Sequence, residues 1–217
     1  MAVDLLALSG FLQKGRAKEV TELVQQALDE GMGAKEILER GLMDGMNIIG
    51  QKFKNNEVFV PEVLIAARAM NMGTAILRPY LVDAGVKATG KVIIGTVKGD
   101  LHDIGKNLVG MMMEGKGLEI IDLGSDVTAQ KYVEEAITHN ADIIACSALL
   151  TTTMTQMKDV VIAAEQAGIR DKIKIMIGGA PVTESYCESI GADYYAPDAA
   201  TAAEIAVGIC TAQTLCY

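Results

Sequence analysis

The sequence predicts an α/β protein in which an N-terminal four-helix bundle precedes a five-stranded parallel sheet of the flavodoxin or Rossmann-like kind. Three observations support this fold class. Residues 1–85 have the apolar spacing of amphipathic helices throughout, and residues 86–217 alternate short apolar runs with helical patterns. Gly85 and Gly90 mark a linker where the pattern changes. We therefore expect two domains, residues 1–85 and residues 86–217.

Four helices are expected in the first domain. "VDLLALSGFLQKG" forms the first helix, and "AKEVTELVQQALDEG" places Val20, Val24 and Leu28 on one apolar stripe that ends before Gly31. "GAKEILERGLMDGMNIIGQKFKNNEVF" continues the helical spacing. "VPEVLIAARAMNMGTAILRPYL" begins with Pro61, whose missing N–H costs little in a first turn. Since the connections are short, an antiparallel bundle is the economical arrangement.

Five strand–helix units are expected in the second domain. The predicted strands are "KVIIGTV", "LEIIDLG", "ADIIACSAL", "KIKIMIGG" and "ADYYAP", and a helical pattern follows each of them. In a sheet of this kind ligands bind at the carboxyl ends of the strands. His102, Ser147, Gly178 and Pro197 all lie at or just past a predicted strand end, so this edge of the sheet is the expected binding edge.

Composition excludes several kinds of protein. The net charge of −9 argues against a nucleic-acid partner, because phosphate binding requires a basic face. No apolar run is expected to reach the roughly 20 residues of a membrane span, and no signal peptide is evident. The cysteines, Cys146, Cys187, Cys210 and Cys216, form no C-x-x-C pair that would indicate zinc or a disulfide framework. We therefore expect a cytoplasmic protein that binds no membrane.

One histidine lies in an unusual loop, "GTVKGDLHDIGKNLVG", residues 95–110. Gly99, Gly105 and Lys106 resemble a phosphate loop, but their spacing is one residue too long and Asn107 replaces the hydroxyl that would hold magnesium. A dinucleotide G-x-G-x-x-G fingerprint is also missing. A structural alternative is that Asp103 caps the next helix and His102 is an ordinary loop residue. The second histidine, His139, is interpreted as a residue at a helix end.

The residues beside His102 favour a role in metal ligation. Asp100 and Asp103 flank it, and an imidazole that ligates a metal commonly donates its other N–H to a carboxylate. A bare zinc ion needs about three or four protein ligands. One histidine can instead supply an axial ligand to a metal that is already held by a macrocycle.

The motif resembles the cobalamin-binding signature of corrinoid methyltransferase proteins. "GDLHDIGKN" contains D-x-H-x-x-G as Asp100, His102 and Gly105. "SALLTTT" at 147–153 and "IGGAPV" at 177–182 follow in the order of that family. "GLMDGMNIIGQKF" and "NEVFVPEVLIAARAM" are similar to the family's helical cap domain, so the resemblance covers nearly the whole chain.

The resemblance implies roles for individual residues. His102 would replace the dimethylbenzimidazole of cobalamin as the lower cobalt ligand, in the state called base-off/His-on. Asp100 would accept the second imidazole N–H, and Thr153 matches a serine that extends this relay. The resemblance also implies a cofactor-binding set, with no catalytic residue of the chain's own: Gly99, Asp100, Leu101, His102, Asp103, Ile104, Gly105, Ser147, Leu149, Thr151, Thr153, Gly178, Gly179, Asp198 and Ala199.

The function implied is that of a non-catalytic corrinoid carrier subunit. It would take a methyl group on cobalt(I) from a substrate-specific methyltransferase and deliver it to a second methyltransferase that acts on a thiol or on a reduced folate or pterin. A reductive activation protein would be a third partner. The helical domain would cover the reactive face, with residues 82–91 as the hinge.

Two other classes of cobalamin protein share parts of this pattern. A cobalamin-responsive regulator usually adds a DNA-binding domain, and no basic helix-turn-helix segment is evident here. The cobalamin subunit of a radical mutase shares the D-x-H-x-x-G signature, but it generally lacks the four-helix domain and uses an adenosyl ligand. The ligand on the bound cofactor, methyl or adenosyl, distinguishes these classes.

Overall fold

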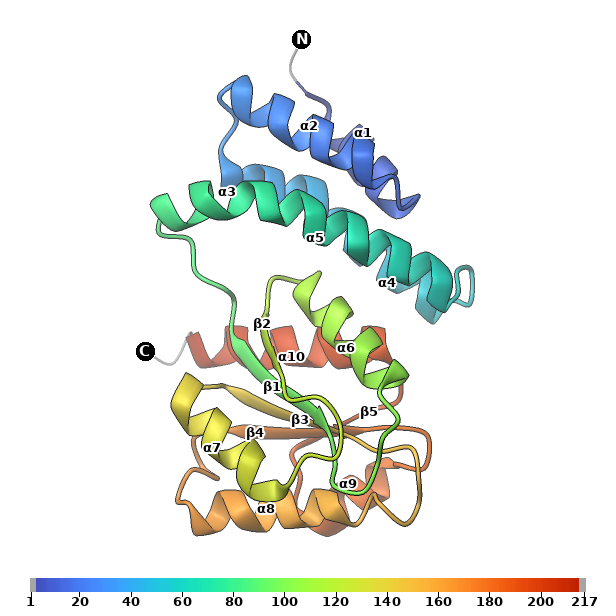
Figure 1. Ribbon diagram of the computed structural model, residues 1–217, viewed down its shortest axis with the longest axis vertical. Helices are drawn as coiled ribbons and strands as arrows, with labels where there is room; N and C mark the ends of the chain where they lie inside the picture. Colours follow the sequence, from blue (N-terminus) through green and yellow to red (C-terminus); the bar gives the residue numbers. More distant parts are fainter. Residues whose placement is uncertain (1–2, 215–217) are drawn as a thin grey trace. The chain divides into compact units, whose positions relative to one another are not determined.

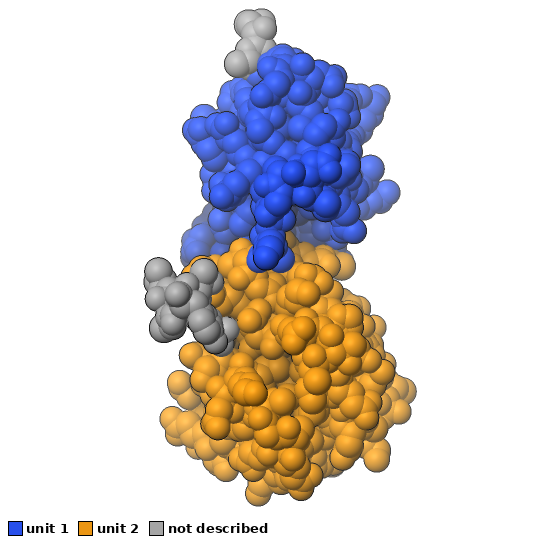
Figure 2. Space-filling view, turned by 90° about the vertical axis from the view of Figure 1, so that its left-hand side faces the viewer, with its two compact units in different colours: residues 1–88, 115–117 blue, residues 89–114, 118–217 orange. Residues whose placement is uncertain are grey.

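The computed structural model describes residues 3–214, which divide into two compact units (Figures 1 and 2). The first unit consists of residues up to 88 together with residues 115–117, and the second of the other residues from 89 onward. The first unit is helical, and the second is built around a β-sheet. The predicted fold class is confirmed.

The helical unit contains the four helical segments expected from the apolar spacing. These are α1 (Leu5–Gln13), α2 (Ala17–Asp29), a continuous run made of α3 (Ala34–Glu36), η1 (Ile37–Met43) and α4 (Asp44–Lys54), and α5 (Val60–Asp83). The π-helical stretch η1 was not expected from the sequence. Two glycines in the third segment allow close packing against α1: an added Cβ would lie 2.5 Å from the Leu8 side chain at Gly41 and 3.0 Å from Leu12 at Gly45.

The helix α5 begins with a proline in its first turn, as predicted, and the Glu62 side chain accepts a hydrogen bond from the backbone N–H of Phe59. It continues past Pro79 to Asp83, two residues beyond the end of the predicted segment. Its length and mean hydropathy reach those of a membrane span, so the expectation that no segment would do so was too strong. One such helix is weak support for a membrane, because core helices of globular proteins share these properties, and Val63, Ala66 and Leu77 are completely buried here.

The second unit is a doubly wound parallel sheet. Its strands are β1 (Lys91–Thr96), β2 (Glu119–Asp122), β3 (Ile143–Ser147), β4 (Lys174–Gly178) and β5 (Tyr194–Ala196), in the spatial order β2-β1-β3-β4-β5. One face carries α6 (Ile104–Glu114) and α10 (Ala199–Thr214). The opposite face carries α7 (Ala129–His139), α8 (Gln156–Gln166) and α9 (Glu184–Ile190) (Figure 1). This is the flavodoxin-like strand order.

Four strands of the sheet end in register. Thr96 pairs with Ser147, Ser147 with Gly178, and Gly178 with Ala196. The loops that leave β1, β3, β4 and β5 therefore start from one straight edge. Chain order reverses between β1 and β3, and α6 and α8 leave these strands toward opposite faces. Such a switch point creates the crevice in which open α/β sheets bind ligands.

Candidate functional site

The site is built on the histidine loop, residues 97–103, which joins β1 to α6 at the switch point. The loop starts with a turn in which the N–H of Asp100 donates to the carbonyl of Val97 at 3.1 Å. Gly99 is the third residue of this turn and has φ +82°, a value that glycine adopts without a steric penalty. After the turn, Asp100 is completely buried and the His102 side chain is 53% exposed.

Both oxygens of Asp100 accept hydrogen bonds. Oδ1 accepts from the backbone N–H of His102 at 3.0 Å and lies 2.7 Å from its ring Nδ1. Oδ2 accepts from the N–H groups of Leu149 and Leu150, at 2.8 and 3.2 Å, and from the Thr153 hydroxyl at 2.7 Å. One carboxylate thus ties the histidine loop to the loop between β3 and α8. The structure places Asp100, His102, Leu149 and Thr153 together, and their contact with a cofactor stays a prediction.

These hydrogen bonds determine the protonation state of Asp100. Burial raises the pKa of its carboxyl group. Hydrogen bonds from Thr153, Leu149 and His102 have a larger, opposite effect, so the pKa lies well below its usual range. Asp100 is therefore an ionised acceptor at neutral pH. Since an ionised carboxylate only accepts, the proton between the two side chains belongs to Nδ1 of His102. With its proton at Nδ1 directed to Asp100, the ring has Nε2 as the nitrogen available to a ligand, and the side chain is half exposed.

The metal-binding groups at this site suit a metal whose other ligands come from a cofactor. Among residues 3–214, no group of three or more His, Cys, Asp or Glu side chains could hold a metal ion. His102 offers a single oriented nitrogen, which is too few for a bare ion but sufficient for one axial position of a metal in a macrocycle. The residues present therefore fit a corrinoid better than they fit a bare ion.

Several apolar side chains are exposed close to His102 in the sequence and on the neighbouring loop. Leu101 and Ile104 are 73% and 76% exposed, and Leu149 and Leu150 on the neighbouring loop are 46% and 41% exposed. Exposed apolar patches of this kind commonly mark binding surfaces. Gly105, at the start of α6, has open space where a Cβ would lie, with respect to the described residues. Packing within this part of the chain therefore gives no reason for a glycine there, whereas the approach of a ligand gives one.

Other predicted residues have structural roles within the sheet unit. Gly179 has φ +130°, and a Cβ there would lie 1.9 Å from the carbonyl oxygen of Ala148. At Gly178 a Cβ would lie 3.0 Å from the carbonyl oxygen of Ala196. Backbone packing therefore requires glycine at position 179 and disfavours a side chain at position 178, with or without a ligand. The carboxylate of Asp198 accepts from the N–H and the hydroxyl of Thr201, at 2.8 and 2.7 Å, and so caps α10.

The remaining predicted residues lie at the same edge of the sheet. Ser147 is the last residue of β3, and its carbonyl accepts from the N–H of Val97 at 3.0 Å. Asp103 and Thr151 are exposed, and Ala199, the first residue of α10, is buried. The carbonyl of Asp103 accepts from the N–H of Asn107 at 2.8 Å. Contact of these residues with a cofactor stays a prediction.

Sequence reasoning missed two residues that support the histidine loop and one ion pair of the helix that follows it. The hydroxyl of Thr96 donates to the His102 carbonyl at 3.0 Å. The carboxylate of Asp126 accepts from the N–H of Gly99 at 2.7 Å, and Lys106, which is only 2% exposed, forms an ion pair with Asp122. The only available signal was that Asp126 follows the predicted strand "LEIIDLG" by two residues and so lies at the binding edge.

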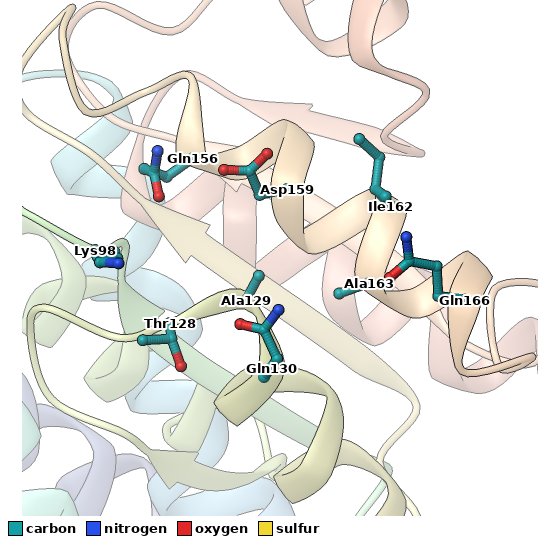
Figure 3. Close-up of a pocket in the computed structure, with 9 residues that line it drawn as sticks. All are labelled: Lys98, Thr128, Ala129, Gln130, Gln156, Asp159, Ile162, Ala163 and Gln166. Carbon is teal, nitrogen blue, oxygen red and sulfur yellow. The ribbon is translucent and has the colours of Figure 1, made fainter.

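A separate polar pocket of about 350 Å³ lies between α7 and α8 (Figure 3). None of the predicted site residues lines it. Its walls carry one cation, Lys98, and one carboxylate, Asp159, together with amide and hydroxyl groups. The lining residues are Lys98, Thr128, Ala129, Gln130, Gln156, Asp159, Ile162, Ala163 and Gln166.

Family models match both parts of the chain. A model described as a B12 binding domain matches residues 90–206, and a second model with the same description matches residues 7–78. The first match contains the histidine loop and all five strands, and the second spans most of the helical unit.

Curated relatives match over nearly their whole length. A corrinoid protein from Desulfitobacterium hafniense is 40% identical over 190 residues, which are 86% of this chain and 88% of the relative. The dimethylamine corrinoid protein of Methanosarcina barkeri is 42% identical over 84% of this chain and 86% of its own. The trimethylamine corrinoid protein 2 of Methanosarcina acetivorans is 43% identical over 83% and 84% of the two chains.

Solved structures agree with these relationships. A cobalamin-binding protein from Desulfitobacterium hafniense has a TM-score of 0.80 and 30% identity over 96% of this chain and 99% of its own. The methanol:cobalamin methyltransferase complex MtaBC from Methanosarcina barkeri has a TM-score of 0.84 and 29% identity over 94% of this chain and 78% of the matched chain.

Proposed function

This chain belongs to the family of corrinoid proteins with B12-binding domains, and from this premise we propose that it carries methyl groups between two methyltransferases. When bound, a corrinoid supplies a cobalt ion that is strongly nucleophilic in its reduced state and can hold a methyl group. The observation that best supports the proposal is the buried Asp100, which orients His102 and leaves Nε2 available on a half-exposed ring.

The side chains of the histidine loop and the loop after β3 have separate tasks in this proposal. His102 Nε2 is the lower cobalt ligand, in place of the dimethylbenzimidazole. Asp100 keeps the proton on Nδ1, and the Thr153 hydroxyl holds the other oxygen of Asp100. Because these side chains form one hydrogen-bonded chain, Asp100 and Thr153 influence how strongly His102 donates its Nε2 lone pair to a metal. The exposed side chains of Leu101, Ile104 and Leu149 provide apolar contact area around the ligand.

The proposed methyl donor is a methylated amine or alcohol, brought by a substrate-specific methyltransferase. Support comes from relatives named for dimethylamine and trimethylamine and from the match to a methanol:cobalamin methyltransferase complex. A second methyltransferase would pass the group to a thiol or to a reduced folate or pterin. A reductive activation protein would restore the reduced cobalt after oxidation.

We assign the helical domain, residues 1–85, to covering the methyl-bearing face. Support comes from its match to a B12-binding model and from the linker that follows α5, where Gly85 has φ +67°. We place the protein in the cytoplasm. The described cysteines, Cys146, Cys187 and Cys210, are buried thiols, as a reducing compartment permits, while Cys216 lies outside the described residues.

The test of the ligand uses cobalamin bound to uniformly ¹⁵N-labelled protein, with cobalt in its paramagnetic +2 state. If a protein nitrogen is the axial ligand, labelling changes the nitrogen hyperfine splitting in the electron paramagnetic resonance spectrum. We expect this change in the wild type and in the control His139→Ala, and its absence in His102→Ala. An unchanged splitting in labelled wild-type protein would show that no protein nitrogen ligates the cobalt.

The test of the carrier role is single-turnover methylation from dimethylamine, trimethylamine or methanol, followed by the corrinoid absorption spectrum. The two methyltransferases are omitted in turn. We expect loading only with the donor's methyltransferase and unloading only with the acceptor's. Catalytic demethylation of a natural donor by this chain alone would contradict the carrier role.

A further inference from the structure

We propose that Asp126 is a positioning residue that keeps the histidine loop in the conformation that presents His102. This inference rests on the proposed function, in which His102 is the ligand. Asp126 lies in the connection between β2 and α7. Its carboxylate accepts from the N–H of Gly99 at 2.7 Å, and its own N–H donates to the carbonyl of Asp100 at 3.0 Å. A single residue therefore holds two consecutive residues of the loop.

The backbone of Asp126 supports this interpretation. It has φ +57°, in the left-handed region that few residues other than glycine adopt, although Asp and Asn tolerate it best. On either side of it the connection pairs regularly with the end of β1. Thr96 donates to Gly124 at 2.9 Å, and Val127 donates to Thr96 at 3.0 Å. Asp126 is the non-glycine residue with positive φ in this connection, whose other such residue is Gly124, and its side chain is not buried in the core.

The histidine loop is held from both sides of β1. On the β3 side, the Asp100 carboxylate accepts from Leu149 and Thr153, as described above. On the β2 side, Asp126 holds the backbone at Gly99 and Asp100. Gly99 is the residue of this loop with the greatest conformational freedom, since it has no side chain and adopts φ +82°. The hydrogen bond from its N–H to Asp126 therefore restricts the backbone of the loop at its most flexible residue.

Releasing Gly99 has a predictable consequence for cobalamin binding. A loop that samples other conformations presents His102 for a smaller fraction of the time. The apparent affinity of a ligand falls in proportion to the fraction of protein in the binding-competent state. Changes in residues that orient a metal ligand typically lower affinity by about 10–100-fold. Because Asp126 acts through Gly99 and Asp100, we expect an effect near the lower end of this range.

Three variants of the full-length protein test the proposal. Asp126→Gly removes the carboxylate but accepts the left-handed backbone, and Asp126→Asn keeps an oxygen that can accept from Gly99. Asn140→Gly is the matched control, because Asn140 also has positive φ, +49°, but caps the far end of α7. The measurements are amide hydrogen exchange of Gly99 in the apoprotein, the dissociation constant for hydroxocobalamin, and the ¹⁵N-sensitive splitting.

For Asp126→Gly we expect about tenfold faster exchange at Gly99, about tenfold weaker hydroxocobalamin binding and a reduced ¹⁵N-sensitive signal. Asp126→Asn and Asn140→Gly should match the wild type. Exchange and affinity in Asp126→Gly equal to the wild type would overturn the proposal, and so would an unprotected Gly99 amide in the wild type. Hydrogen exchange is measured without cobalamin. Unchanged exchange at Gly99 in Asp126→Gly therefore counts against the role of Asp126 and not against the role of His102. Absence of the ¹⁵N effect in the wild type counts against the His102 assignment.

Discussion

At Asp100, burial and hydrogen bonding act in opposite directions. Complete burial of a carboxylate is costly unless donors replace the lost water. Here backbone and side-chain donors from two loops outweigh the effect of burial and keep the pKa of Asp100 well below its usual range. Its folded-state pKa is therefore lower than its unfolded-state pKa. The resulting stability is present above the unfolded-state value of about 3.9 and is lost as the pH falls toward the folded-state pKa.

The substitution Thr153→Val tests this balance. It keeps the shape of the side chain but removes a hydroxyl that donates to Oδ2 of Asp100 at 2.7 Å. A hydrogen bond to a charged group contributes about 1.5–3 kcal/mol, so the free energy of unfolding should fall by about that amount at pH 7. The pKa of Asp100 should rise toward its ordinary value.

The difference between Thr153→Val and the wild type should narrow only as the pH falls through the folded-state pKa of Asp100 in the variant, because the variant then loses its ionised carboxylate first. Urea unfolding between pH 7 and about pH 2 measures this. Thr153→Ser, which keeps a hydroxyl, should remain close to the wild type. A loss of stability that is equal at every pH would show that the Thr153 hydroxyl does not act through the charge of Asp100.

Among the elements, two glycines at the binding edge have opposite physical explanations. Gly179 follows β4, and its absent side chain is required by the carbonyl of Ala148, 1.9 Å from where a Cβ would lie. Gly105 begins α6 next to open space. Packing of the strand ends explains the first glycine, whereas packing among the described residues does not account for the second.

The pair Gly179→Ala and Gly105→Ala separates these explanations. Gly179→Ala should lower the free energy of unfolding of the apoprotein by roughly 2–4 kcal/mol, because it combines a left-handed backbone with a steric clash. Gly105→Ala should leave it unchanged or raise it by up to about 1 kcal/mol. Only Gly105→Ala should weaken hydroxocobalamin binding without a loss of stability. Chemical denaturation and a hydroxocobalamin titration of each variant provide the measurements. Equal hydroxocobalamin affinity in Gly105→Ala and the wild type would contradict a ligand contact at Gly105.

The elements that sequence reasoning predicted well are those with a local signal. The order of helices and strands follows from apolar spacing, and the pairing of His102 with Asp100 follows from a motif within one loop. The π-helical stretch Ile37–Met43 was missed because its apolar pattern is close to that of an α-helix. The cap at Asp198 has a local signal, an aspartate directly before a helix, whereas the family resemblance implies only a cofactor contact for this residue.

The contacts that sequence reasoning could not predict join distant parts of the chain. Asp126 and Gly99 are 27 positions apart and meet only because β2 lies beside β1. Gly179 meets Ala148 only because β3 and β4 end in register. In each case the sequence contains both residues, but the sheet topology decides that they are neighbours.

At the scale of the whole molecule, the sheet unit has a hydrophobic core of its own. The residues of one hydrophobic core cluster, among them Ile93, Tyr132, Ile144, Met157 and Ile175, all belong to this unit. The hydrogen bonds that orient His102 also come from this unit, through Asp100, Thr153 and Asp126. A core and a site that lie within one unit are the properties of an independently folding domain.

We therefore predict that residues 86–217, expressed alone, fold and bind cobalamin through His102. The fragment should show a cooperative thermal transition, because this core cluster lies entirely within it. Its affinity for hydroxocobalamin should lie within about tenfold of that of the full chain, since the lower ligand and the residues that orient it are retained. The same fragment with His102→Ala is the control and should lose the ¹⁵N-sensitive splitting.

The fragment should differ from the full chain in the lifetime of reduced cobalt. If residues 1–85 cover the reactive face, their removal exposes cobalt(I) to water and oxidants, and oxidation should be faster at equal cobalamin occupancy. Stopped-flow absorption after chemical reduction measures both rates. Equal rates would contradict a protective role for the helical domain, and a fragment that remains unfolded would show that the sheet unit depends on the helices for its stability.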